Sequence, residues 1–423
     1  MDFKTLPASG PFRLDNITVP ACLLGGDGGL IRHALTVDDG KLSEMTEGPV
    51  IDMGGAMVLP CLIDMHTHLD KGHIWPRSPN PDGSFMGALS TVAGDRATNW
   101  SAEDVRTRMD FALRCAWAYG TSALRTHIDS ISPQDSISWP VFAELREKWA
   151  GRVALQGAAL AGIDRVDLAG DYARTADIVA EHGGVLGMVT YPVEGLRAKL
   201  HTLFELAEAR DLELDFHADE TSDPSAATLR VIAEVALERG FARPITVGHC
   251  CSLAVQPEAE ALETVDLVAR AGINIVSLPM CNMYLQDRAA GRTPRWRGIT
   301  LVHEMKARGI NVSFASDNTR DPFYAYGDLD MIEVLREATR IAQLDHSDPD
   351  WISAFLTNPA RACGFDAPSL APGAPADLVI LRARNWTEAL ARPQSDRIVL
   401  RAGRALDRIL PDYAELDHLM RTP

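Results

Sequence analysis

The amino-acid sequence predicts an α/β protein whose centre is a (β/α)₈ TIM barrel, joined to a small β-sandwich domain formed by the two ends of the chain. The first observation behind this prediction is a series of short aliphatic runs without polar alternation, which is typical of parallel strands buried on both faces. The second is that amphipathic segments separate the runs, so that strand and helix alternate as they do in a barrel. The runs are Ala56–Met65, Ser122–Ile128, Arg152–Leu160, Gly184–Thr190, Leu212–His217, Pro244–His249, Ile273–Leu278 and Asn311–Ala315.

The amphipathic segments carry the signals that begin and end helices. Ser101 can cap the start of a helix that runs to Tyr119, and Gly120 can end it. A Gly-rich dinucleotide fingerprint is missing after the first run, which argues against an open, doubly wound sheet. Further helical segments are Arg197–Arg210, Ala226–Gly240, Glu258–Gly272 and Leu301–Gly309.

Both ends of the chain contain short extended pieces, and these differ from the runs of the centre. A helical segment at Trp351–Cys363 precedes the pieces of the second end. We expect residues 1–58 and 366–423 to fold together as the small β-domain, and residues 59–365 to form the barrel. The extended pieces are Phe12–Val19, Ile31–Leu35, Val50–Asp52, Ala376–Leu381 and Arg397–Leu400.

The composition excludes several classes of protein. Apolar residues make up 46% and charged residues 23% of the 423 residues, which is the balance of an ordinary globular protein. The formal net charge of −17 argues against nucleic-acid binding, which needs clustered Lys and Arg. Neither a signal peptide nor an apolar stretch long enough to span a membrane is apparent. The seven cysteines show no C-x-x-C spacing, so we expect no disulfide framework and a cytoplasmic location.

Histidines and one aspartate stand where the predicted strands end. The first strand runs into His66 and His68. His217 ends the fifth strand, His249 ends the sixth, and Asp317 follows the eighth. Barrel enzymes place their active sites at the carboxyl ends of the strands, so we expect these side chains to meet. Imidazole nitrogens together with one carboxylate suit Zn²⁺ or Fe²⁺.

Segments along nearly the whole chain resemble motifs of the amidohydrolase superfamily, and in particular its cytosine-deaminase branch. Leu59–Asp70 resembles the strand-1 motif of the superfamily, and Gly373–Ile380 is similar to its returning β-domain segment. His217–Glu220 looks like the H-x-x-E of the branch. Gly248–Cys250 and Gly298–Phe323 resemble its strand-6 and strand-8 regions.

The resemblance implies one divalent metal ion, Zn²⁺ or Fe²⁺, bound by His66, His68, His217 and Asp317. Binuclear members of the superfamily bridge two ions with a carboxylated Lys or a Glu, commonly on strand 4. The corresponding segment, Met188–Pro192, contains neither residue, so we expect a single ion.

Catalytic roles for Asp317, Glu220 and His249 follow from the same resemblance. Asp317 takes the proton of the attacking water, and Glu220 carries a proton to the ring nitrogen and then to the leaving amine. His249 stabilises the hydroxide or the developing charge. The prediction is therefore a metal-dependent hydrolytic deaminase of a small amino-substituted nitrogen heterocycle.

Two positions depart from cytosine deaminases where contact with the substrate is expected. Val193 stands in place of a Gln that reads the pyrimidine edge, and Asn318 replaces a second Asp near the leaving amino group. A valine cannot pair with an amide edge, which argues against cytosine itself. Phe323, in the strand-8 motif, is also assigned to the substrate pocket. Lys71 either contacts the substrate or forms an ion pair with a loop carboxylate.

Two other functions stay open. His66–Lys71 resembles N-isopropylammelide isopropylaminohydrolases, so the alternative is hydrolysis of an alkylamino group or a cyclic amide. A non-catalytic barrel protein is the third interpretation, although such proteins typically lose metal ligands. The resemblance further implies a homo-oligomer. We expect the loop of residues 73–100 to cover the pocket, with its aromatic residues either binding substrate or packing in the core.

Overall fold

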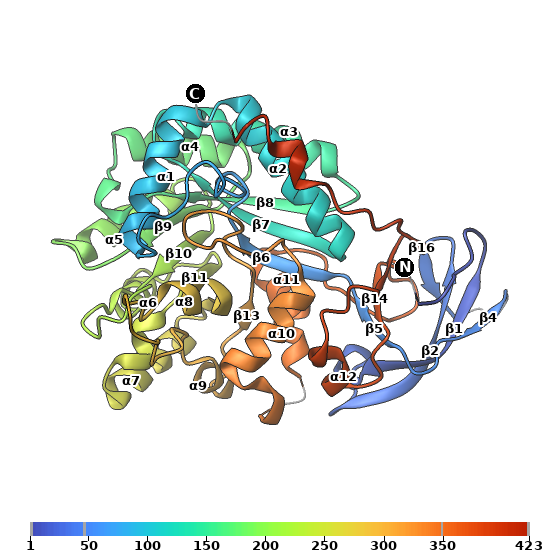
Figure 1. Cartoon of the computed structure of the whole chain (residues 1–423). Coiled ribbons are helices and arrows are strands. Elements are labelled where there is room, and N and C mark those ends of the chain that lie inside the picture. The colour runs from blue at the N-terminus through green and yellow to red at the C-terminus, as the bar shows by residue number, and fades with distance from the viewer. Residues whose placement is uncertain (1–2, 45–47, 348–349, 421–423) are drawn as a thin grey trace.

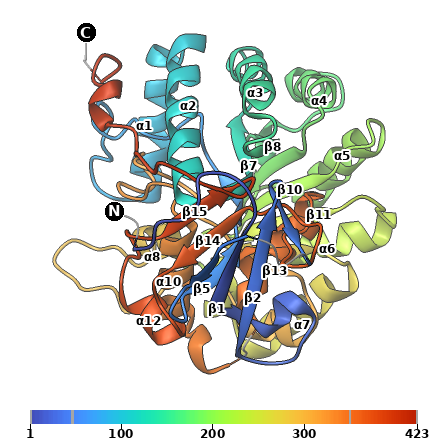
Figure 2. The same ribbon diagram turned by 90° about the vertical axis from the view of Figure 1, so that its right-hand side faces the viewer.

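The computed structural model describes residues 3–44, 48–347 and 350–420 of the chain. Its larger part consists of parallel strands with helices around them, and its smaller part is a mixed sheet built from both ends of the chain (Figure 1). Figure 2 looks onto the smaller part, where strands from the beginning and the end of the chain lie side by side.

The larger part contains the parallel strands β6 (Leu62–Thr67), β7 (Thr121–Asp129), β8 (Ala154–Leu160), β9 (Leu186–Thr190), β10 (Leu214–Ala218), β11 (Ile245–His249), β12 (Asn274–Ser277) and β13 (Val312–Phe314). They pair in two sheets, with the orders β6-β7-β8 and β13-β12-β11-β10-β9. Isolated parallel bridges join the sheets, between Ala158 and Val185 on one side and between Thr67 and Asp317 on the other. The result is a TIM-barrel-like α/β domain.

Helices follow most of these strands and pack outside them (Figure 1). They are α1 (Phe85–Asn99), α2 (Ala102–Tyr119), α3 (Asp135–Trp149), α4 (Asp171–Glu181), α5 (Leu196–Glu208), α6 (Thr228–Arg239), α7 (Glu258–Arg270), α8 (Pro279–Leu285), α9 (Val302–Ala307), α10 (Met331–Ala342) and α11 (Thr357–Cys363). Both predicted ends of α2 are confirmed. The Ser101 side chain accepts a hydrogen bond from the Asp104 N–H, and Gly120 ends the helix in the left-handed region. Of the helices in the described residues, none combines the length and apolarity needed to cross a membrane.

The smaller part is an eight-stranded sheet with the order β16-β15-β14-β5-β1-β2-β3, in which β4 also pairs with β1. Its elements are β1 (Phe12–Pro20), β2 (Leu30–Asp38), β3 (Lys41–Ser43), β4 (Val50–Asp52), β5 (Met57–Pro60), β14 (Leu378–Leu381), β15 (Ile398–Arg401) and β16 (Arg404–Ala405), with helix α12 (Trp386–Ala391) between β14 and β15. The prediction of one strand over Ala56–Met65 is wrong, because this run forms β5 and β6. The Cys61 N–H donates to the Asp377 carbonyl and the Leu62 N–H to the Gly120 carbonyl, so the chain changes sheets here.

The last described residues leave this sheet and return to the barrel helices. The short 3₁₀ helix η6 (Tyr413–Leu416) places Leu416 against Phe111 and Cys115 of α2. The predicted β-domain of residues 366–423 therefore includes a tail that packs on α2 instead of on the terminal sheet.

Gly120 yields the first prediction, because it connects α2 to β7 and touches the terminal sheet. Its φ is +91°, and a Cβ there would lie 2.5 Å from Cγ2 of Val379. A left-handed alanine costs about 1–2 kcal/mol, and overpacking adds about 1–3 kcal/mol. We expect Gly120→Ala to lower the free energy of unfolding in urea by about 2 kcal/mol or more.

The matched control is Gly94→Ala, in α1, where a Cβ would meet open space. Alanine is the better helix former, so this variant should be as stable as the parent or slightly more stable. Equal stability of the two variants would contradict the close approach at Gly120.

Candidate active site

The predicted metal ligands His66, His68, His217 and Asp317 meet in the interior at the carboxyl ends of the strands, and all four are buried. Nε2 of His68 lies 3.1 Å from Oδ1 of Asp317 and 3.3 Å from Nε2 of His217. Nε2 of His66 lies 3.5 Å from the same carboxylate oxygen. The Asp317 N–H donates to the His66 carbonyl at 2.9 Å, which holds the carboxylate beside β6.

These four residues fit a divalent cation. Both ring nitrogens of His66 and both carboxylate oxygens of Asp317 are buried without a hydrogen-bond partner among the described residues. Burial holds the pKa of His68 and of His217 well below the ordinary value, so each imidazole is neutral and offers a lone pair. A buried carboxylate without a counter-charge is costly, and a cation bound among these atoms would compensate it.

His127, on β7, also belongs to this cluster and was not predicted. Potential ligand atoms of His66, His68, His127 and His217 all lie within 4.8 Å of one another. Nε2 of His127 is 3.0 Å from the carboxylate of Asp215, and its Nδ1 has no partner among the described residues. The signal was present in the sequence, because His127 lies near the end of the second apolar run, in the kind of position that drew attention to the other histidines.

A salt bridge beneath the cluster fixes the orientation of His127. Arg125 donates to the second carboxylate oxygen of Asp215 at 2.8 Å and also contacts Glu213. Although burial opposes ionisation, the neighbouring His127 and Arg125 lower the pKa of Asp215 to about 2. Asp215 therefore stays a carboxylate that accepts a hydrogen bond from His127, an arrangement that orients imidazoles at metal sites.

Glu220 and His249, the predicted catalytic pair, lie side by side next to the cluster. Oε1 of Glu220 is 3.4 Å from Nδ1 of His249. The amide nitrogen of Asn282, on α8, contacts both atoms, at 3.0 Å and 2.9 Å. Burial, together with the charge of Asp317, raises the pKa of Glu220 well above the ordinary value, so this carboxyl can hold a proton near neutral pH. Asn282 was not predicted; its local sequence carries no motif that singles it out.

Lys71 forms an ion pair with a carboxylate and also lies beside the predicted substrate pocket, the two alternatives that the sequence left open. Its Nζ lies 3.5 Å from Asp129, and Arg96 donates to the other oxygen of that carboxylate at 2.6 Å. Nζ also lies 5.1 Å from the ring centroid of Phe323. Although burial opposes ionisation, Lys71 and Arg96 hold the pKa of Asp129 below the ordinary value. A buried ion pair therefore stands beside a residue of the predicted substrate pocket.

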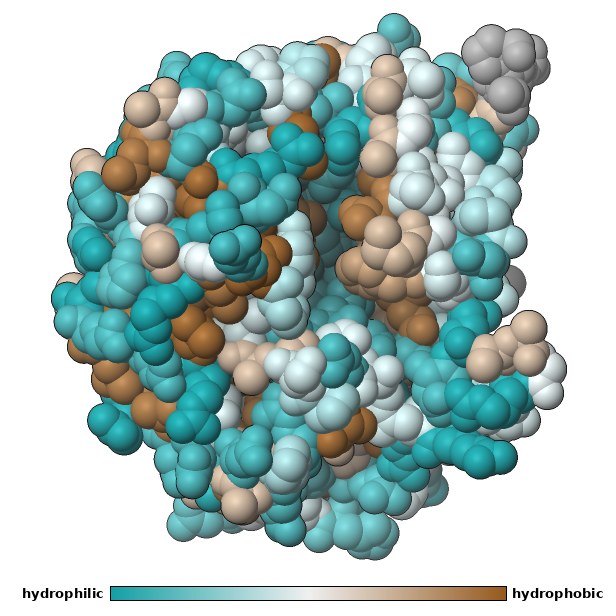
Figure 3. Space-filling model, turned by 90° about the vertical axis from the view of Figure 1, so that its left-hand side faces the viewer, coloured by the Kyte–Doolittle hydropathy of each residue, from teal (hydrophilic) through white to brown (hydrophobic). Residues whose placement is uncertain are grey.

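A cavity of about 790 Å³ adjoins the cluster. Figure 3 shows the corresponding face of the molecule, which is hollowed near its centre and has apolar surface along the hollow. The polar end of the cavity contains His68, His217, Glu220, His249 and Asp317. Its apolar wall includes Phe85, Met86, Leu89 and Val92 of α1, together with Ile131, Leu160 and Phe323.

The structure brings most of the predicted substrate residues to this cavity. Lys71, Asn318 and Phe323 line it. Val193 is not among the lining residues; it is partly buried and packs against the core, whereas Tyr191 and Pro192 face the cavity. Within the covering loop predicted over residues 73–100, residues 85–99 instead form helix α1. Its first residue, Phe85, lines the cavity wall, while Trp100 packs in the core.

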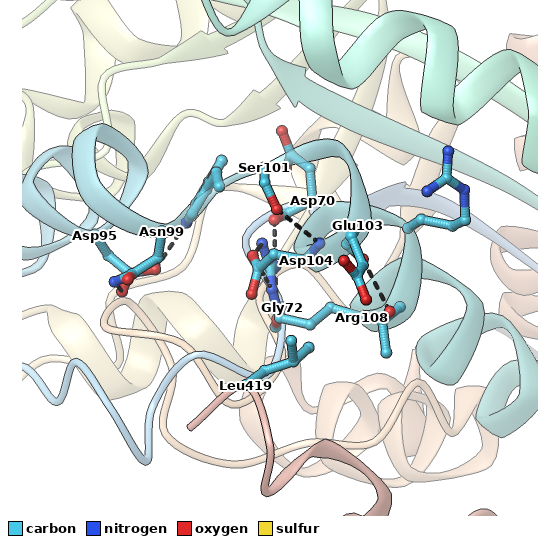
Figure 4. Close-up of polar contacts among 12 residues, drawn as sticks. Asp70, Gly72, Asp95, Asn99, Ser101, Glu103, Asp104, Arg108 and Leu419 are labelled. Atoms are coloured by element: carbon cyan, nitrogen blue, oxygen red, sulfur yellow. Dashed lines mark hydrogen bonds and ion pairs between the residues drawn. The ribbon is translucent and has the colours of Figure 1, made fainter. Parts of the chain in front are cut away.

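The backbone just after His68 is held by a buried arginine of α2 (Figure 4). Arg108 donates to the carbonyls of Asp70 and Gly72 and forms an ion pair with Asp104 at 2.6 Å. Arg77, in the covering loop, pairs with the same Asp104 and donates to the carbonyl of Leu419 at 3.1 Å. The segment that carries Lys71 is thus tied to α2, the covering loop and the C-terminal tail.

The fold and this cluster define a class of protein. Residues 121–406 match the model of the amidohydrolase family, and the chain belongs to that family. Members of the family use a divalent metal, which agrees with the ligand chemistry of the cluster.

Individual relatives narrow the comparison. The chain is 52% identical to a pterin deaminase of Rhizobium rhizogenes, over 98% of each chain. It is 24% identical to the N-isopropylammelide isopropyl amidohydrolase of a Pseudomonas species, over 86% of this chain and 90% of that one. The structure of 5-methylcytosine deaminase from Klebsiella pneumoniae superposes with a TM-score of 0.79 at 25% identity, covering 93% of this chain and 97% of that one.

These similarities confirm the predicted superfamily and the predicted class of enzyme, a hydrolase acting on carbon–nitrogen bonds other than peptide bonds. The protein is thus an enzyme of the amidohydrolase family, and the interpretation as a non-catalytic barrel is set aside.

A second prediction concerns His127. We expect His127→Gln to weaken metal binding by about 10- to 100-fold, because the ring of His127 contacts that of His66, and loss of a group that supports a metal's ligands has an effect of that size. His66→Gln, which removes a member of both candidate ligand groups, should abolish binding. Competition with a chromophoric zinc chelator measures both affinities.

His33→Gln, on β2 of the terminal sheet, is the control and should bind like the parent. Parent-like affinity in His127→Gln would show that His127 has no part in the metal centre.

Proposed function

We propose that this protein is a hydrolytic deaminase of a pterin-type ring, which converts a ring carbon bearing an amino group into a carbonyl and releases ammonia. The observation that carries the proposal is the junction of the His–Asp cluster with a cavity of about 790 Å³, in a chain 52% identical to a pterin deaminase over 98% of its length.

The cavity supports a flat, two-ring substrate. Its volume lies in the range of pockets that enclose whole small molecules. Aromatic and aliphatic side chains, among them Phe85, Val92 and Phe323, can cover the faces of an aromatic ring. Because Val193 does not line the cavity, position 193 offers no group to read the edge of cytosine.

The ligand set supports a single divalent ion, Zn²⁺ or Fe²⁺, held by His66, His68, His217 and Asp317. Such an ion lowers the pKa of water and makes hydroxide accessible at neutral pH. Asp317 is placed to take a proton from the attacking water. Glu220 then gives its own proton to the ring nitrogen and carries the proton of the added hydroxyl group to the departing amine, which leaves as ammonia while the hydroxyl becomes the carbonyl. The proton taken up by Asp317 restores Glu220.

Lys71 and Asn318 are proposed to read the polar edge of the ring. Lys71 reaches the cavity while paired with Asp129, so its charge is already compensated when it donates to a ring carbonyl or nitrogen. The Asn318 amide nitrogen donates to Asp321 at 2.7 Å, which holds the side chain in one orientation at the cavity wall.

Hydrolysis of an alkylamino group is the second candidate. The segment His66–Lys71 supports it, as does the similarity to the N-isopropylammelide hydrolase. Release of an alkylamine instead of ammonia distinguishes this reaction from deamination.

We also propose that the two parallel sheets close as one (β/α)₈ barrel over residues 59–365, and that the strands within residues 1–58 and 366–423 form a sandwich. The bridge between Thr67 and Asp317 supports closure. The seven cysteines are free, which supports a reducing cytoplasm. A homo-oligomer is proposed from the resemblance to the superfamily.

The third prediction tests the reaction. Metal-loaded protein should release ammonia from pterin, with less or none from cytosine and creatinine, as measured by a coupled ammonia assay. Glu220→Gln should lower kcat by at least about 100-fold, because proton transfer typically contributes that much, and should keep its metal. If protein that contains bound metal released no ammonia from pterin, the proposed substrate would be refuted.

The fourth prediction concerns Lys71. We expect Lys71→Met to raise KM for pterin by about 10-fold or more, because a hydrogen bond to a charged group contributes about 1.5–3 kcal/mol. Lys148→Met, which removes an exposed lysine of α3 paired with Asp110, is the control and should leave KM unchanged. An unchanged KM in Lys71→Met would contradict the proposed contact with the substrate and leave Lys71 with a structural role only, as the ion-pair partner of Asp129.

A further inference from the structure

Two side chains hold Glu220, one from helix α8 and one from the residue that directly follows this helix. Asn282 donates to Oε1 of Glu220 at 3.0 Å, and Gln286 donates to the main-chain carbonyl of Glu220 at 3.1 Å. The helix is itself held closely, because a Cβ at Gly298 would lie 2.6 Å from Cβ of Gln286 and 2.8 Å from the carbonyl oxygen of Asn282. The amide of Asn282 is therefore a fixed group beside the catalytic pair.

The hydrogen-bonding capacity of Asn282 decides which nitrogen of His249 carries the proton. An amide nitrogen has two hydrogens and only donates. One hydrogen goes to Oε1 of Glu220, and the other points to Nδ1 of His249, 2.9 Å away. That nitrogen must accept, so the imidazole proton lies on Nε2. Oε1 of Glu220 accepts this bond whether the group is ionised or carries its proton on Oε2, and the opposite orientation of the amide would then set two acceptor oxygens against each other in a buried place, which is costly.

Nε2 of His249 has no partner among the described residues, and His249 lines the cavity. The distances alone would admit His249 to a metal site, because its ligand atom lies within 4.8 Å of those of His66 and Asp317. A protonated Nε2, however, has no lone pair to offer a cation. It can only donate a hydrogen bond.

We propose that Asn282 is a positioning residue that holds His249 as the Nε2–H tautomer and, through the same amide, orients the carboxyl group of Glu220. His249 is then a hydrogen-bond donor to the attacking oxygen and not a fifth metal ligand. The consequence for rate rests on the proposed deaminase function, because the donor stabilises negative charge that develops on that oxygen. The tautomer itself does not depend on the substrate.

The experiment is long-range ¹H–¹⁵N NMR of protein labelled with ¹⁵N-histidine, in which the His249 signals are assigned by their loss in His249→Gln. The expected result for the parent protein is a proton on Nε2 and none on Nδ1. Asn282→Asp replaces the donor by an acceptor of the same shape, so the proton should move to Nδ1. In this variant kcat should fall by about 10- to 100-fold, with KM and metal content unchanged.

Two further variants separate positioning from packing. Asn282→Leu removes the donor without adding an acceptor and should give a mixture of tautomers. Gln286→Leu removes only the contact with the Glu220 carbonyl, so it should keep the parent tautomer and lose less activity than Asn282→Asp.

Asn385→Asp is the control for the chemical change, because Asn385 is the exposed N-cap of α12, whose side-chain oxygen accepts from the Glu388 N–H at 2.9 Å and would still accept as a carboxylate. It should behave like the parent. A proton on Nδ1 in the parent protein, or the parent tautomer in both Asn282 variants, would overturn the inference. Inactivity of the parent protein on pterin would instead refute the proposed function, while the NMR result would still decide the role of Asn282.

Discussion

The hydrogen bond from the Asp317 N–H to the His66 carbonyl, 2.9 Å long, joins the end of the last parallel strand to the first. The same residue carries the carboxylate that lies 3.1 Å from His68 and 3.5 Å from His66. Its backbone is in the left-handed region, with φ of +67°, a conformation that costs a non-glycine residue about 1–2 kcal/mol. The contact between the last and the first parallel strand and the placement of the Asp317 carboxylate among the histidines are thus one constraint, and strain is retained at the point where they coincide.

Buried charges around this centre are compensated in two separate places. Below it, Arg125 and Asp215 form a pair that orients His127. Beside the cavity, Lys71 and Arg96 share the carboxylate of Asp129. Removing one member of such a pair leaves an uncompensated buried charge, which is far more costly than the pair itself is stabilising. The cluster of imidazoles and Asp317 remains as the place where a bound cation would complete the balance.

The predicted metal ligands and the cavity wall come from different parts of the fold. The predicted ligands lie at strand ends, which the sheet pairing holds in register. Much of the apolar wall comes from α1, in the loop of residues 73–100, which Arg77 and Arg108 tie to α2. Loops can change without disturbing the strands that carry the chemistry. This separation gives a physical route by which substrates can differ on one fold, as the names of relatives for pterin, 5-methylcytosine and N-isopropylammelide do.

Sequence by itself determined the parallel strands, most of their ends, and the order of histidines and aspartate along them, because strand periodicity and the rule for barrel sites are local or topological. It also determined the family, through motifs that are continuous in the chain. Tertiary structure alone decided the division of Ala56–Met65 into two strands, since that depends on which sheet each backbone group pairs with. The placement of Asn282 and Val193 was decided there too, whereas the position of His127 near a strand end was a signal already present in the sequence. Whether a side chain faces a cavity depends on the packing of segments far apart in the chain, and no local pattern encodes that packing.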